Sequence, residues 1–493
     1  MDEGAGGSPA PGLPRQAEPF CQSRSRAADW ADRLLRPSTV AVVGASADPR
    51  KPGGAIFENL CRSAVRVYPI NPRASHVAGR PCFASVLDVP DEVDMAVVAV
   101  PADVVSEVVD HCAQKGVGVI VVVSGGLGET GEAGKRAERR MAEAALSRGS
   151  RILGPNTVGV YVPGSRLDTT FIPGDRWQRP PVGPIALVCQ SGALGLDAAE
   201  LCSAYGVGIS AMVSLGNKCD LNERDLVEAL ARDPSTRCIA LYLESLTDGR
   251  AFVDVCRRVS PEKPIVVTKA GRSEAGARAA ALHTGALAGS DRVLNGVLKQ
   301  VGVVRAYDVG ELVDSALALT YGRPLHRPRL AVLSCAGGYA VTLADYLTAS
   351  ERGLGASLAV LSERTVHRLR EVTVPFAALE NPIDLTGSVT NAAFNGALEA
   401  LEQDPNVDAI VVSLVPYPPL LDEGVVDVLE RWHRQGSKPL VTVVTGLVFG
   451  PRVLRRLWRA GALAYPTPWQ AVRALDVLCQ RGEYLRRLAE SGR

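Results

Sequence analysis

The stretch Ile185–Gly195, IALVCQSGALG, shows the pattern that decides the fold. Its first five residues are apolar and predict a buried strand, and the residues from Ala193 onward predict a helix that follows a small-residue turn. The stretch 330–347, LAVLSCAGGYAVTLADYL, repeats this layout, and an offset of 146 residues places Ser191 on Gly337. We therefore expect an internal pseudo-repeat of strand, turn and helix.

The same alternation begins earlier in the chain. The run 38–44, STVAVVG, predicts a strand that enters the turn Gly44-Ala45-Ser46, and helical spacing follows at 56–63. Later strands are expected at 65–70, 95–100, 117–123, 238–243, 264–269, 409–415 and 439–445. Helices expected between or after them include 104–115, 135–148, 193–205, 223–231 and 469–482. This alternation predicts parallel, doubly wound α/β sheets that bind ligands at the carboxyl ends of their strands.

The chain is expected to divide into a leader and three α/β units. The leader, residues 1–34, begins with a Gly/Pro-rich stretch, and a Pro/Arg-rich linker at 322–329 separates the last two units. The expected domains are 35–150, 151–322 and 327–485.

Composition excludes several classes of function. The 493 residues include 54 basic and 53 acidic side chains, for a net charge of +1, which predicts binding to neither nucleic acid nor an anionic membrane. The 11 cysteines form no CxxC pair, so we expect reduced core thiols and no metal site. There is no apolar run of 18 residues and no secretory h-region, which predicts a cytoplasmic protein.

The loops of the first unit form a candidate ligand site. The turn at Gly44 lacks the GxGxxG spacing of dinucleotide-binding folds, and such turns often only pack a helix on a strand. Further loops rich in Gly, Pro, Asn or Ser are YPINPR (68–73), VAVPADV (98–104), VVSGGLGE (122–129) and GPNTVGVY (154–161). Because the ends of parallel strands meet at one edge of a sheet, we expect these loops to build one site.

Two helix starts are candidate phosphate sites. Ser191, Gly192 and Ala193 open a predicted helix, where unpaired backbone N–H groups and the positive end of the helix dipole favour an anion. In the pseudo-repeat, Gly337 and Gly338 take the equivalent place. The alternative for Ser191 is an ordinary N-cap, whose hydroxyl accepts a hydrogen bond from the helix backbone.

One histidine and one glutamate suggest phosphoryl transfer. His283 lies in the stretch 279–291, AAALHTGALAGSD, which we expect to be a glycine-punctuated loop beyond a Val-rich strand. A neutral imidazole nitrogen is nucleophilic near pH 7, and a carboxylate such as Glu244 can fix its tautomer. The alternative is an ordinary loop or core histidine, which a lone histidine more often is.

Several motifs occur in the order found in the α subunits of ADP-forming acyl-CoA synthetases, relatives of the succinyl-CoA synthetase α subunit. The chain resembles that family from about Arg36 to about Trp469. The motifs are GASADPRKPGG, YPINPR, GPNTVGVY, QSGALG, SLGNK, YLES, HTGALAGSD, CAGG and ENPIDLTG. The resemblance implies a Rossmann-like CoA-binding domain followed by two flavodoxin-like ligase domains.

The resemblance also implies a CoA site in the first domain. The residues implied for it are Gly44, Ala45, Ser46, Lys51, Gly53, Gly54, Asn71, Pro72, Val100 and Pro101. The Gly44 turn and the Lys51 loop would hold the phosphates of CoA, and Val100 would lie beside its adenine. Candidate contacts to the substrate are Asn156, Thr157, Gly216 and Asn217.

The reaction implied by the resemblance interconverts acyl-CoA, ADP and phosphate with carboxylic acid, CoA and ATP. It passes through an acyl phosphate and a phosphohistidine. His283 would be the phosphorylated residue and Glu244 its support, and the helix starts at Ser191 and Gly337 would hold the phosphoryl group.

Some residues depart from the family pattern. Leu282 and Ala286 stand where the family usually has serines, and Tyr339 stands where a proline is commoner. We recognise no ATP-grasp domain in the sequence. We therefore expect a partner β subunit to bind Mg²⁺ with ADP or ATP, in an α2β2 or similar assembly.

The sequence disfavours two other functions. A catalytically silent CoA or acyl-CoA sensor or scaffold would need only the first domain, so the joint presence of His283, Glu244 and QSGALG disfavours it. A dinucleotide-dependent oxidoreductase is disfavoured because Asn71 and Pro72, and no acidic residue, end the second strand.

Overall fold

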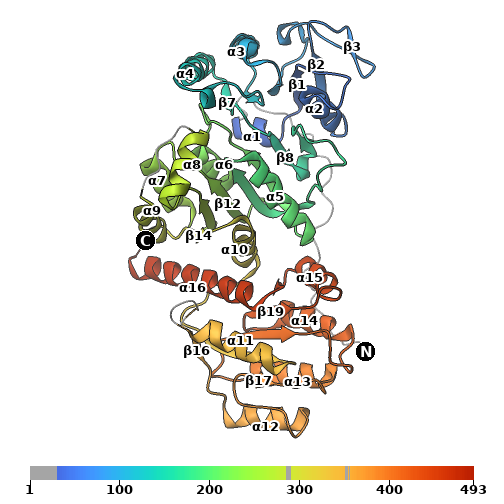
Figure 1. Ribbon diagram of the computed structural model, residues 1–493, viewed down its shortest axis with the longest axis vertical. Helices are drawn as coiled ribbons and strands as arrows, with labels where there is room; N and C mark the ends of the chain where they lie inside the picture. Colours follow the sequence, from blue (N-terminus) through green and yellow to red (C-terminus); the bar gives the residue numbers. More distant parts are fainter. Residues whose placement is uncertain (1–29, 285–289, 350–353, 355, 493) are drawn as a thin grey trace, which may run out of the picture.

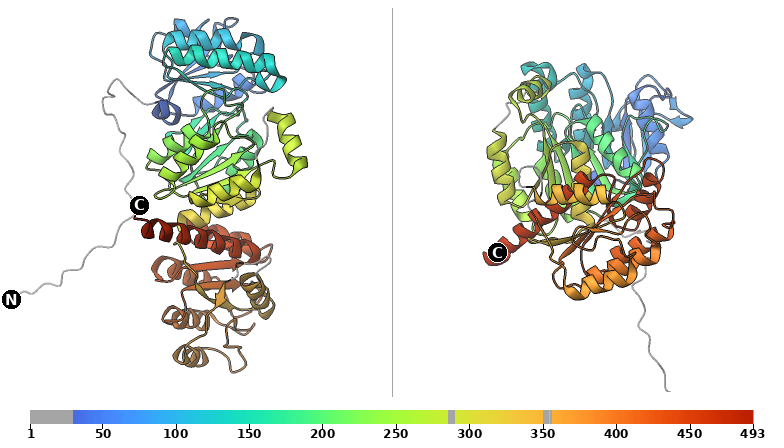
Figure 2. Two further views of the ribbon diagram at one scale, coloured as in Figure 1. Left: turned by 90° about the vertical axis from the view of Figure 1, so that its left-hand side faces the viewer. Right: turned by 60° about the horizontal axis from the view of Figure 1, so that its bottom comes forward.

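Three α/β domains follow one another along the long axis of the protein, with the first at the top of Figure 1 and the third at the bottom. The computed structural model describes residues 30–284, 290–349, 354 and 356–492, and the side chains of these residues except for 280–284. Figure 2 shows from the side that α16 (Pro468–Glu490) runs between the second and third domains.

The first domain is built on a parallel sheet with strand order β2-β1-β5-β6-β7. Its elements are α1 (Trp30–Leu35), β1 (Thr39–Val43), α2 (Pro52–Cys61), β2 (Arg66–Ile70), β3 (His76–Val77), β4 (Arg80–Pro81), η1 (Val86–Asp88), β5 (Met95–Val98), α3 (Ala102–Lys115), β6 (Val119–Val122), η2 (Gly128–Thr130), α4 (Glu132–Ser147) and β7 (Arg151–Leu153). Along β1, Val40 and Val42 belong to the same core cluster as α2, whereas Ala41 belongs to that of α3 and α4. Helices therefore cover both faces of the sheet, as predicted.

The outer edge of β2 explains the Rossmann-like character of this domain. Phe83 forms an isolated parallel bridge with Ile70, beyond the five strands of the sheet. A third strand occupies this position in the 3-2-1-4-5 order of Rossmann folds. Here that strand is reduced to a single bridge.

The second domain has the strand order β14-β13-β12-β10-β11-β8-β9. Its elements are β8 (Val160–Val162), η3 (Pro163–Ser165), β9 (Leu167–Asp168), β10 (Val182–Cys189), α5 (Gly192–Ala204), β11 (Ile209–Ser214), α6 (Glu223–Arg232), β12 (Cys238–Leu243), α7 (Gly249–Val259), β13 (Ile265–Lys269), α8 (Glu274–Thr284), α9 (Asp291–Gln300), β14 (Val304–Ala306) and α10 (Val309–Tyr321). The strands β10 to β14 are parallel and follow the flavodoxin order 2-1-3-4-5, and β8 and β9 extend the sheet antiparallel.

The third domain has the strand order β16-β15-β18-β19-β20, which is again 2-1-3-4-5 when the two-residue strand β17, beside β15, is not counted. Its elements are β15 (Arg329–Ser334), α11 (Gly337–Thr348), β16 (Ser357–Leu358), α12 (Glu363–Val372), β17 (Ile383–Asp384), α13 (Asn391–Glu402), β18 (Ala409–Leu414), α14 (Gly424–Gln435), β19 (Leu440–Val444), α15 (Gly450–Arg459), β20 (Leu463–Tyr465) and α16. The expected fold class, a Rossmann-like domain followed by two flavodoxin-like domains, is confirmed.

Several expected boundaries change. β7 pairs with β6, so the first sheet continues past residue 150 to Leu153. The expected leader ends inside α1, where Leu34 is buried, because apolar side chains there pack on the first core. The pseudo-repeat shifts by one residue: α5 begins at Gly192 and α11 at Gly337, so the helix starts are 145 residues apart and Gly337 matches Gly192 instead of Ser191.

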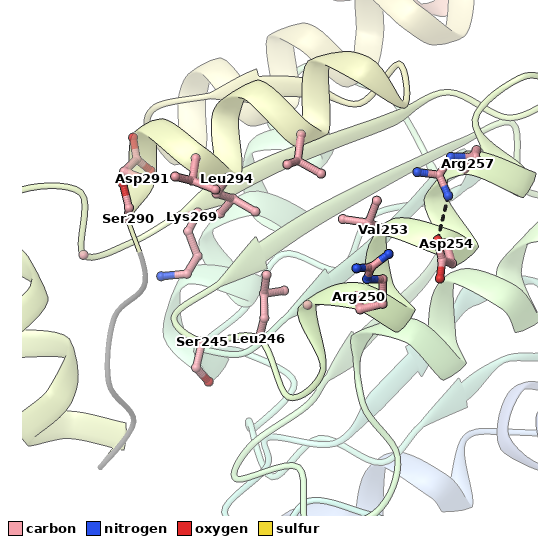
Figure 3. A pocket seen from close by; sticks show the side chains of 14 residues that line it. Ser245, Leu246, Arg250, Val253, Asp254, Arg257, Lys269, Ser290, Asp291 and Leu294 are labelled. Atoms are coloured by element: carbon pink, nitrogen blue, oxygen red, sulfur yellow. Dashed lines mark hydrogen bonds and ion pairs between the residues drawn. The ribbon is translucent and has the colours of Figure 1, made fainter.

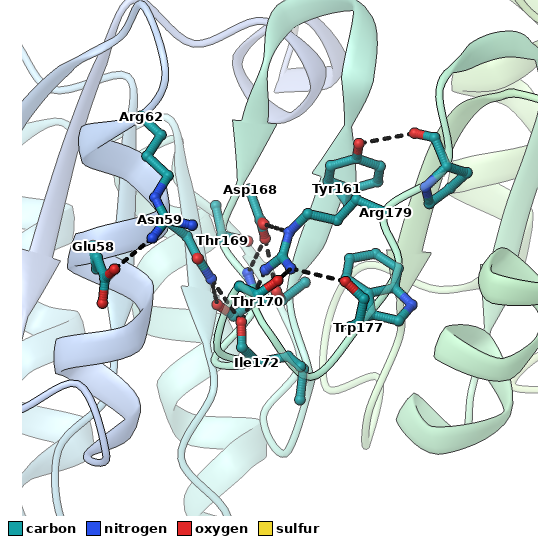
Figure 4. A network of polar contacts seen from close by, with 12 residues as sticks. Glu58, Asn59, Arg62, Tyr161, Asp168, Thr169, Thr170, Ile172, Trp177 and Arg179 are labelled. Carbon is teal, nitrogen blue, oxygen red and sulfur yellow. Dashed lines mark hydrogen bonds and ion pairs between the residues drawn. The ribbon is translucent and has the colours of Figure 1, made fainter. Parts of the chain in front are cut away.

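The first and second domains are joined by a polar network around α2 (Figure 4). The buried amide of Asn59 donates to the carbonyl oxygens of Thr170 and Ile172, at 2.9 and 3.0 Å. Arg179 donates to the Ile172 carbonyl at 2.9 Å and to Asp168 Oδ2 at 2.6 Å. These bonds hold in place the loop that accepts the hydrogen bonds of Asn59. Since α2 follows the Gly44 turn, this network fixes that turn relative to the second domain.

The second and third domains share one hydrophobic core, to which α10 and α16 both contribute. Arg481 of α16 donates to the carbonyl oxygens of Ser260 and Pro261 in the second domain. Asp314 of α10 lies at the same interface, only 5% exposed, and its Oδ2 accepts from Gln470 Nε2 at 2.8 Å. Its Oδ1 has no hydrogen-bond partner among the described residues.

Burial raises the pKa of Asp314 to about 6. Because this value lies above that of an unfolded aspartate, about 4, the protein should lose about 3 kcal/mol of stability as the pH rises from about 4 to about 6. The Asp314→Asn variant keeps an acceptor for Gln470 and does not titrate, so it should be more stable than wild type above pH 6 and similar near pH 4. Denaturant unfolding across this pH range measures the difference, and a constant difference would contradict the assignment.

Candidate functional site

The carboxyl edge of the first sheet carries a cavity of about 700 Å³. Three adjacent strands, β2, β1 and β5, end at this edge. The predicted residues that line the cavity are Gly44, Ser46, Lys51, Asn71, Pro72, Val100 and Pro101. The structure therefore gathers most of the expected CoA residues around one space, as the parallel strands predicted.

The turn that opens this cavity requires glycine. Gly44 has φ +90°, and a Cβ there would lie 2.2 Å from the carbonyl oxygen of Ala99. Asn71 Nδ2 donates to the carbonyl oxygen of Ala45 at 2.9 Å and so ties two strand ends together. The bare backbone of Gly44 leaves space that a ligand can approach.

Three of the predicted CoA residues do not line the cavity. Ala45 is fully buried, and a Cβ on Gly53 would lie 2.0 Å from the carbonyl oxygen of Gly44. A Cβ on Gly54 would similarly lie 1.9 Å from the Asp48 carbonyl oxygen. These small residues let α2 pack closely on the turn.

The cavity also has lining residues outside the set predicted to contact CoA. They include Arg73, Ser85, Glu107 and His111. Arg73 directly follows the Asn71-Pro72 pair, and Arg73 and Lys51 bring two cationic side chains to the cavity, which suits an anionic ligand. Glu107 and His111 are four residues apart on α3 and so share a helix face, a spacing that could have been read from the sequence.

The second-domain site is centred on Glu244, directly after β12. Gln190 Oε1 accepts from the backbone N–H groups of Glu244 and Ser245, at 2.9 and 3.0 Å. Gln190 Nε2 donates to Ser245 Oγ at 3.1 Å. Since Gln190 precedes Ser191 and α5, this side chain places the Glu244 backbone beside the α5 N-terminus.

A buried ion pair supports the same region. Lys218 Nζ and Glu223 Oε2 are 3.0 Å apart, with side chains only 3% and 1% exposed. Lys218 also donates to the Ser245 carbonyl oxygen at 2.9 Å, and Glu223 Oε1 accepts from the Thr247 N–H at 2.8 Å. Burial lowers the pKa of Lys218, and the charges of Glu223 and Glu244 oppose that shift.

A second lysine, Lys269, ends β13 on the same edge. It is 8% exposed and donates to the carbonyl oxygen of Ala270 at 2.6 Å. Burial lowers the pKa of Lys269, and the charges of Asp291 and Glu244 oppose the shift. Glu244 thus has two buried lysines within electrostatic range. Lys218 belongs to the SLGNK motif, whereas sequence reasoning did not identify Lys269 as part of this site.

The N-terminus of α5 is the first of the two predicted phosphate sites. Ser191 is the N-cap residue, but its hydroxyl makes no capping hydrogen bond, unlike an ordinary N-cap. A Cβ on Gly192 would lie 2.1 Å from Val158 Cγ2, so close packing requires glycine there. Ala193 is exposed, and the first turn contains no acidic residue.

The second predicted phosphate site is elsewhere in this chain. Gly337 and Gly338 open α11, which lies in the third domain on the far side of α16 from α5 (Figure 1). Asp384 Oδ2 is 2.8 Å from where a Cβ on Gly337 would lie, so a carboxylate is already near this helix start. Within a single chain, Gly337 and Glu244 therefore lie in different domains and are not brought together. The repeat predicted the local structure at Gly337, but not the orientation of the third domain.

His283 is in the last turn of α8, which ends at Thr284, so the prediction of a loop at this residue is wrong. The alanine-rich sequence before it favours a helix. The position of the His283 side chain, and residues 285–289, lie outside the described part of the structure.

The predicted substrate contacts mainly join the first two domains. Thr157 is 2% exposed, and its hydroxyl donates to the Ser214 carbonyl oxygen at 2.6 Å. Asn217 Nδ2 donates to Glu129 Oε2 and Glu138 Oε1, at 2.6 and 2.7 Å, which links the domains. A Cβ on Gly216 would lie 2.1 Å from the carbonyl oxygen of Pro155, and the exposed Asn156 donates weakly to Asn217 Oδ1, at 3.4 Å.

The described residues carry neither a metal site nor a membrane-spanning helix. Among residues 30–284, 290–349 and 356–492, no group of His, Cys, Asp and Glu is arranged to hold a metal ion. Ten cysteines within the described residues are free thiols. None of the described helices is long and apolar enough to span a membrane.

Family models match three consecutive segments of the chain. A CoA binding domain matches residues 38–163, a succinyl-CoA ligase-like flavodoxin domain matches 182–319, and a ligase-CoA domain matches 330–488. These segments correspond to the three sheets described above.

Relatives with known names match nearly the whole chain. The ADP-forming acetate–CoA ligase I α subunit of Pyrococcus furiosus is 39% identical, over 91% of this chain and 96% of that protein. The ADP-forming acetate–CoA ligase I of Archaeoglobus fulgidus is 37% identical over 91% of this chain, which spans 63% of it. The structure of the dinucleotide-forming acetyl-coenzyme A synthetase 1 of Ca. Korarchaeum cryptofilum, in complex with phosphate and ADP, matches with a TM-score of 0.84 and 36% identity, over 93% of this chain and 98% of that one. The chain belongs to the family of α subunits of ADP-forming acyl-CoA synthetases.

Proposed function

We propose that this chain is the CoA-binding, phosphohistidine-bearing subunit of a nucleoside-diphosphate-forming acyl-CoA synthetase. One observation carries the assignment of the site: Gln190 links the start of α5 to the backbone of Glu244. A helix start that favours an anion therefore adjoins a carboxylate that can orient a histidine. Family membership supports the overall reaction and the role of His283, and the contacts of Gln190 support the placement of Glu244 beside the start of α5.

CoA binds in the cavity at the carboxyl edge of the first sheet. The Gly44 turn lets its phosphates approach the backbone, and Lys51 and Arg73 neutralise their charge. Val100 and Pro101 offer an apolar wall to the adenine. From this cavity the thiol end extends toward the second domain, which α2 and Asn217 hold against the first.

In the first chemical step, a phosphate oxygen attacks the thioester carbonyl carbon of acyl-CoA. The C–S bond breaks, CoA leaves as the thiolate, and acyl phosphate remains. The backbone N–H groups at Gly192 and Ala193 and the ammonium groups near Glu244 stabilise the phosphate charge.

In the second step, a ring nitrogen of His283 attacks the phosphorus atom of acyl phosphate. The bond from phosphorus to the acyl oxygen breaks and the carboxylate leaves. Glu244 accepts a hydrogen bond from the other ring nitrogen and stabilises the positive charge on the ring. The phosphohistidine then transfers its phosphoryl group to ADP.

A partner subunit with an ATP-grasp site supplies the nucleotide, together with Mg²⁺ that neutralises its phosphates. The lengths of the relatives support this part of the proposal. This chain spans 96% of a relative named as an α subunit, but 63% of a relative whose name carries no subunit. The additional part of the longer protein is where an ATP-grasp site would reside, and the separate-chain form would assemble as α2β2.

Free thiols among the described residues suit a cytoplasmic location.

The CoA site is tested with Lys51→Ala. Loss of a cationic contact to phosphate should weaken CoA binding about tenfold. Calorimetric titration with CoA measures this, with Arg139→Ala, an exposed arginine on α4, as the control. Equal affinities of the two variants would place CoA elsewhere.

Phosphorylation is tested by mass spectrometry after incubation with phosphate and a panel of acyl-CoAs. Wild type should gain one acid-labile phosphoryl group, and His283→Ala should gain none. Glu244→Gln should be phosphorylated at least about tenfold more slowly. If wild type gains no phosphoryl group with any acyl-CoA, with or without the partner subunit, the chain is a CoA-binding sensor or scaffold instead.

The buried ion pair gives a stability prediction. Lys218→Met leaves Glu223 charged and buried, and should cost about 3–5 kcal/mol. The double variant Lys218→Met, Glu223→Gln removes both charges and retains an acceptor for the Thr247 N–H, so it should recover most of that loss. Denaturant unfolding measures both, and equal losses in the single and double variants would show that the charge pair is unimportant.

A further inference from the structure

A cavity of about 620 Å³ opens beside Glu244, between α7 and α9. Ser245, the residue after Glu244, lines it together with Lys269. Figure 3 shows Lys269 near Ser245 and Ser290 at one end, and the Arg257–Asp254 pair at the other. Its volume is in the range of small-ligand sites, about 300–1,000 Å³.

Among the described residues, the carboxylates that line this cavity are paired with arginines and form no ion pair with Lys269. Asp254 is paired with Arg257 at 2.6 Å, and Asp291 with Arg305 at 2.9 Å. Lys269 Nζ bonds only to the backbone carbonyl of Ala270 within the described residues. A buried ammonium with this single partner favours an anionic group at its end of the cavity.

The rest of the wall is mainly apolar. Leu246 and Val253 line it on the α7 side, and Val293, Leu294 and Val297 line it on the α9 side. Inorganic phosphate alone gains nothing from such a wall. A ligand with an anionic head and a hydrocarbon tail satisfies both parts of the cavity.

We propose that this cavity is the acyl pocket of the enzyme, and that it selects monocarboxylic acids with an apolar chain longer than that of acetate. The carboxylate of the ligand faces Lys269, next to Glu244, and its hydrocarbon chain lies between α7 and α9. This inference rests on the proposed function, because it places the acyl group where the acyl phosphate forms.

Gly249 allows the pocket to be filled without disturbing the fold. It lines the cavity at the start of α7, and a Cβ there would meet only Leu246 Cδ1, at 3.9 Å. Gly249→Phe therefore places an aromatic ring in the space proposed for the hydrocarbon chain of the ligand. Gly296→Phe is the matched control, because Gly296 is exposed on α9, does not line the cavity and has nothing within 4 Å of its Cβ position.

Calorimetric titration of the full chain with acetate, butyrate, hexanoate and neutral hexanamide tests the proposal. Each methylene that leaves water strengthens binding by about fourfold, so hexanoate should bind at least about tenfold more tightly than acetate. Hexanamide should bind at least about tenfold more weakly than hexanoate, because it lacks the charge. Lys269→Gln should weaken the three acids alike, and Gly249→Phe should weaken hexanoate far more than acetate.

Two results would overturn the proposal. One is equal binding of acetate and hexanoate. The other is that Gly249→Phe shows the same preference for hexanoate over acetate as the control Gly296→Phe. Phosphorylation of His283 from phosphate and acetyl-CoA is measured on wild type and on the control Gly296→Phe, and it should occur in both. Phosphorylation without the chain-length effect would refute the acyl pocket alone. The chain-length effect without phosphorylation would refute the proposed reaction alone.

Discussion

The buried ion pair between Lys218 and Glu223 is the interaction on which the second-domain site depends. Two charges removed from water are costly unless each also finds polar partners. Here Lys218 bonds to the Ser245 carbonyl, and Glu223 accepts from the Thr247 backbone. The pair therefore fixes the segment after Glu244, and Gln190 fixes the backbone of Glu244 and Ser245.

The same loop connects this site to the first domain. Asn217, next to Lys218, donates to Glu129 and Glu138, which follow the β6 strand of the first sheet. The loop that organises Glu244 thus also holds the CoA-binding domain. In the proposed reaction a thioester bound by the first domain meets phosphate at the second, and these polar contacts set the position of the two domains relative to each other.

The sequence predicted the architecture well because each strand, turn and helix is specified locally. Apolar runs such as 185–189 form buried strands, and the small residues after them allow helices to begin, which places Gly44, Asn71 and Val100 around one cavity. The short strands β8 and β9 were missed, since two or three residues carry no clear periodicity.

Tertiary contacts could not be predicted in the same way. Asn217 acquires its role from Glu129 and Glu138, which are distant in sequence, and Lys218 and Lys269 become buried charges only through the packing of the second domain. The pseudo-repeat placed two helix starts in equivalent local settings, but the orientation of the third domain separates Gly337 from Glu244. The helix around His283 was missed because the glycines that follow it suggested a loop.

The route of one oxygen atom tests the central claim most directly. When ¹⁸O-labelled phosphate and acyl-CoA react in unlabelled water, attack by phosphate followed by cleavage at phosphorus leaves one phosphate oxygen in the carboxylic acid. Mass spectrometry of the acid released by the chain with its partner subunit and ADP should therefore find one ¹⁸O per molecule. Acid that carries no ¹⁸O would show that water cleaves the thioester and would contradict the acyl phosphate and phosphohistidine route.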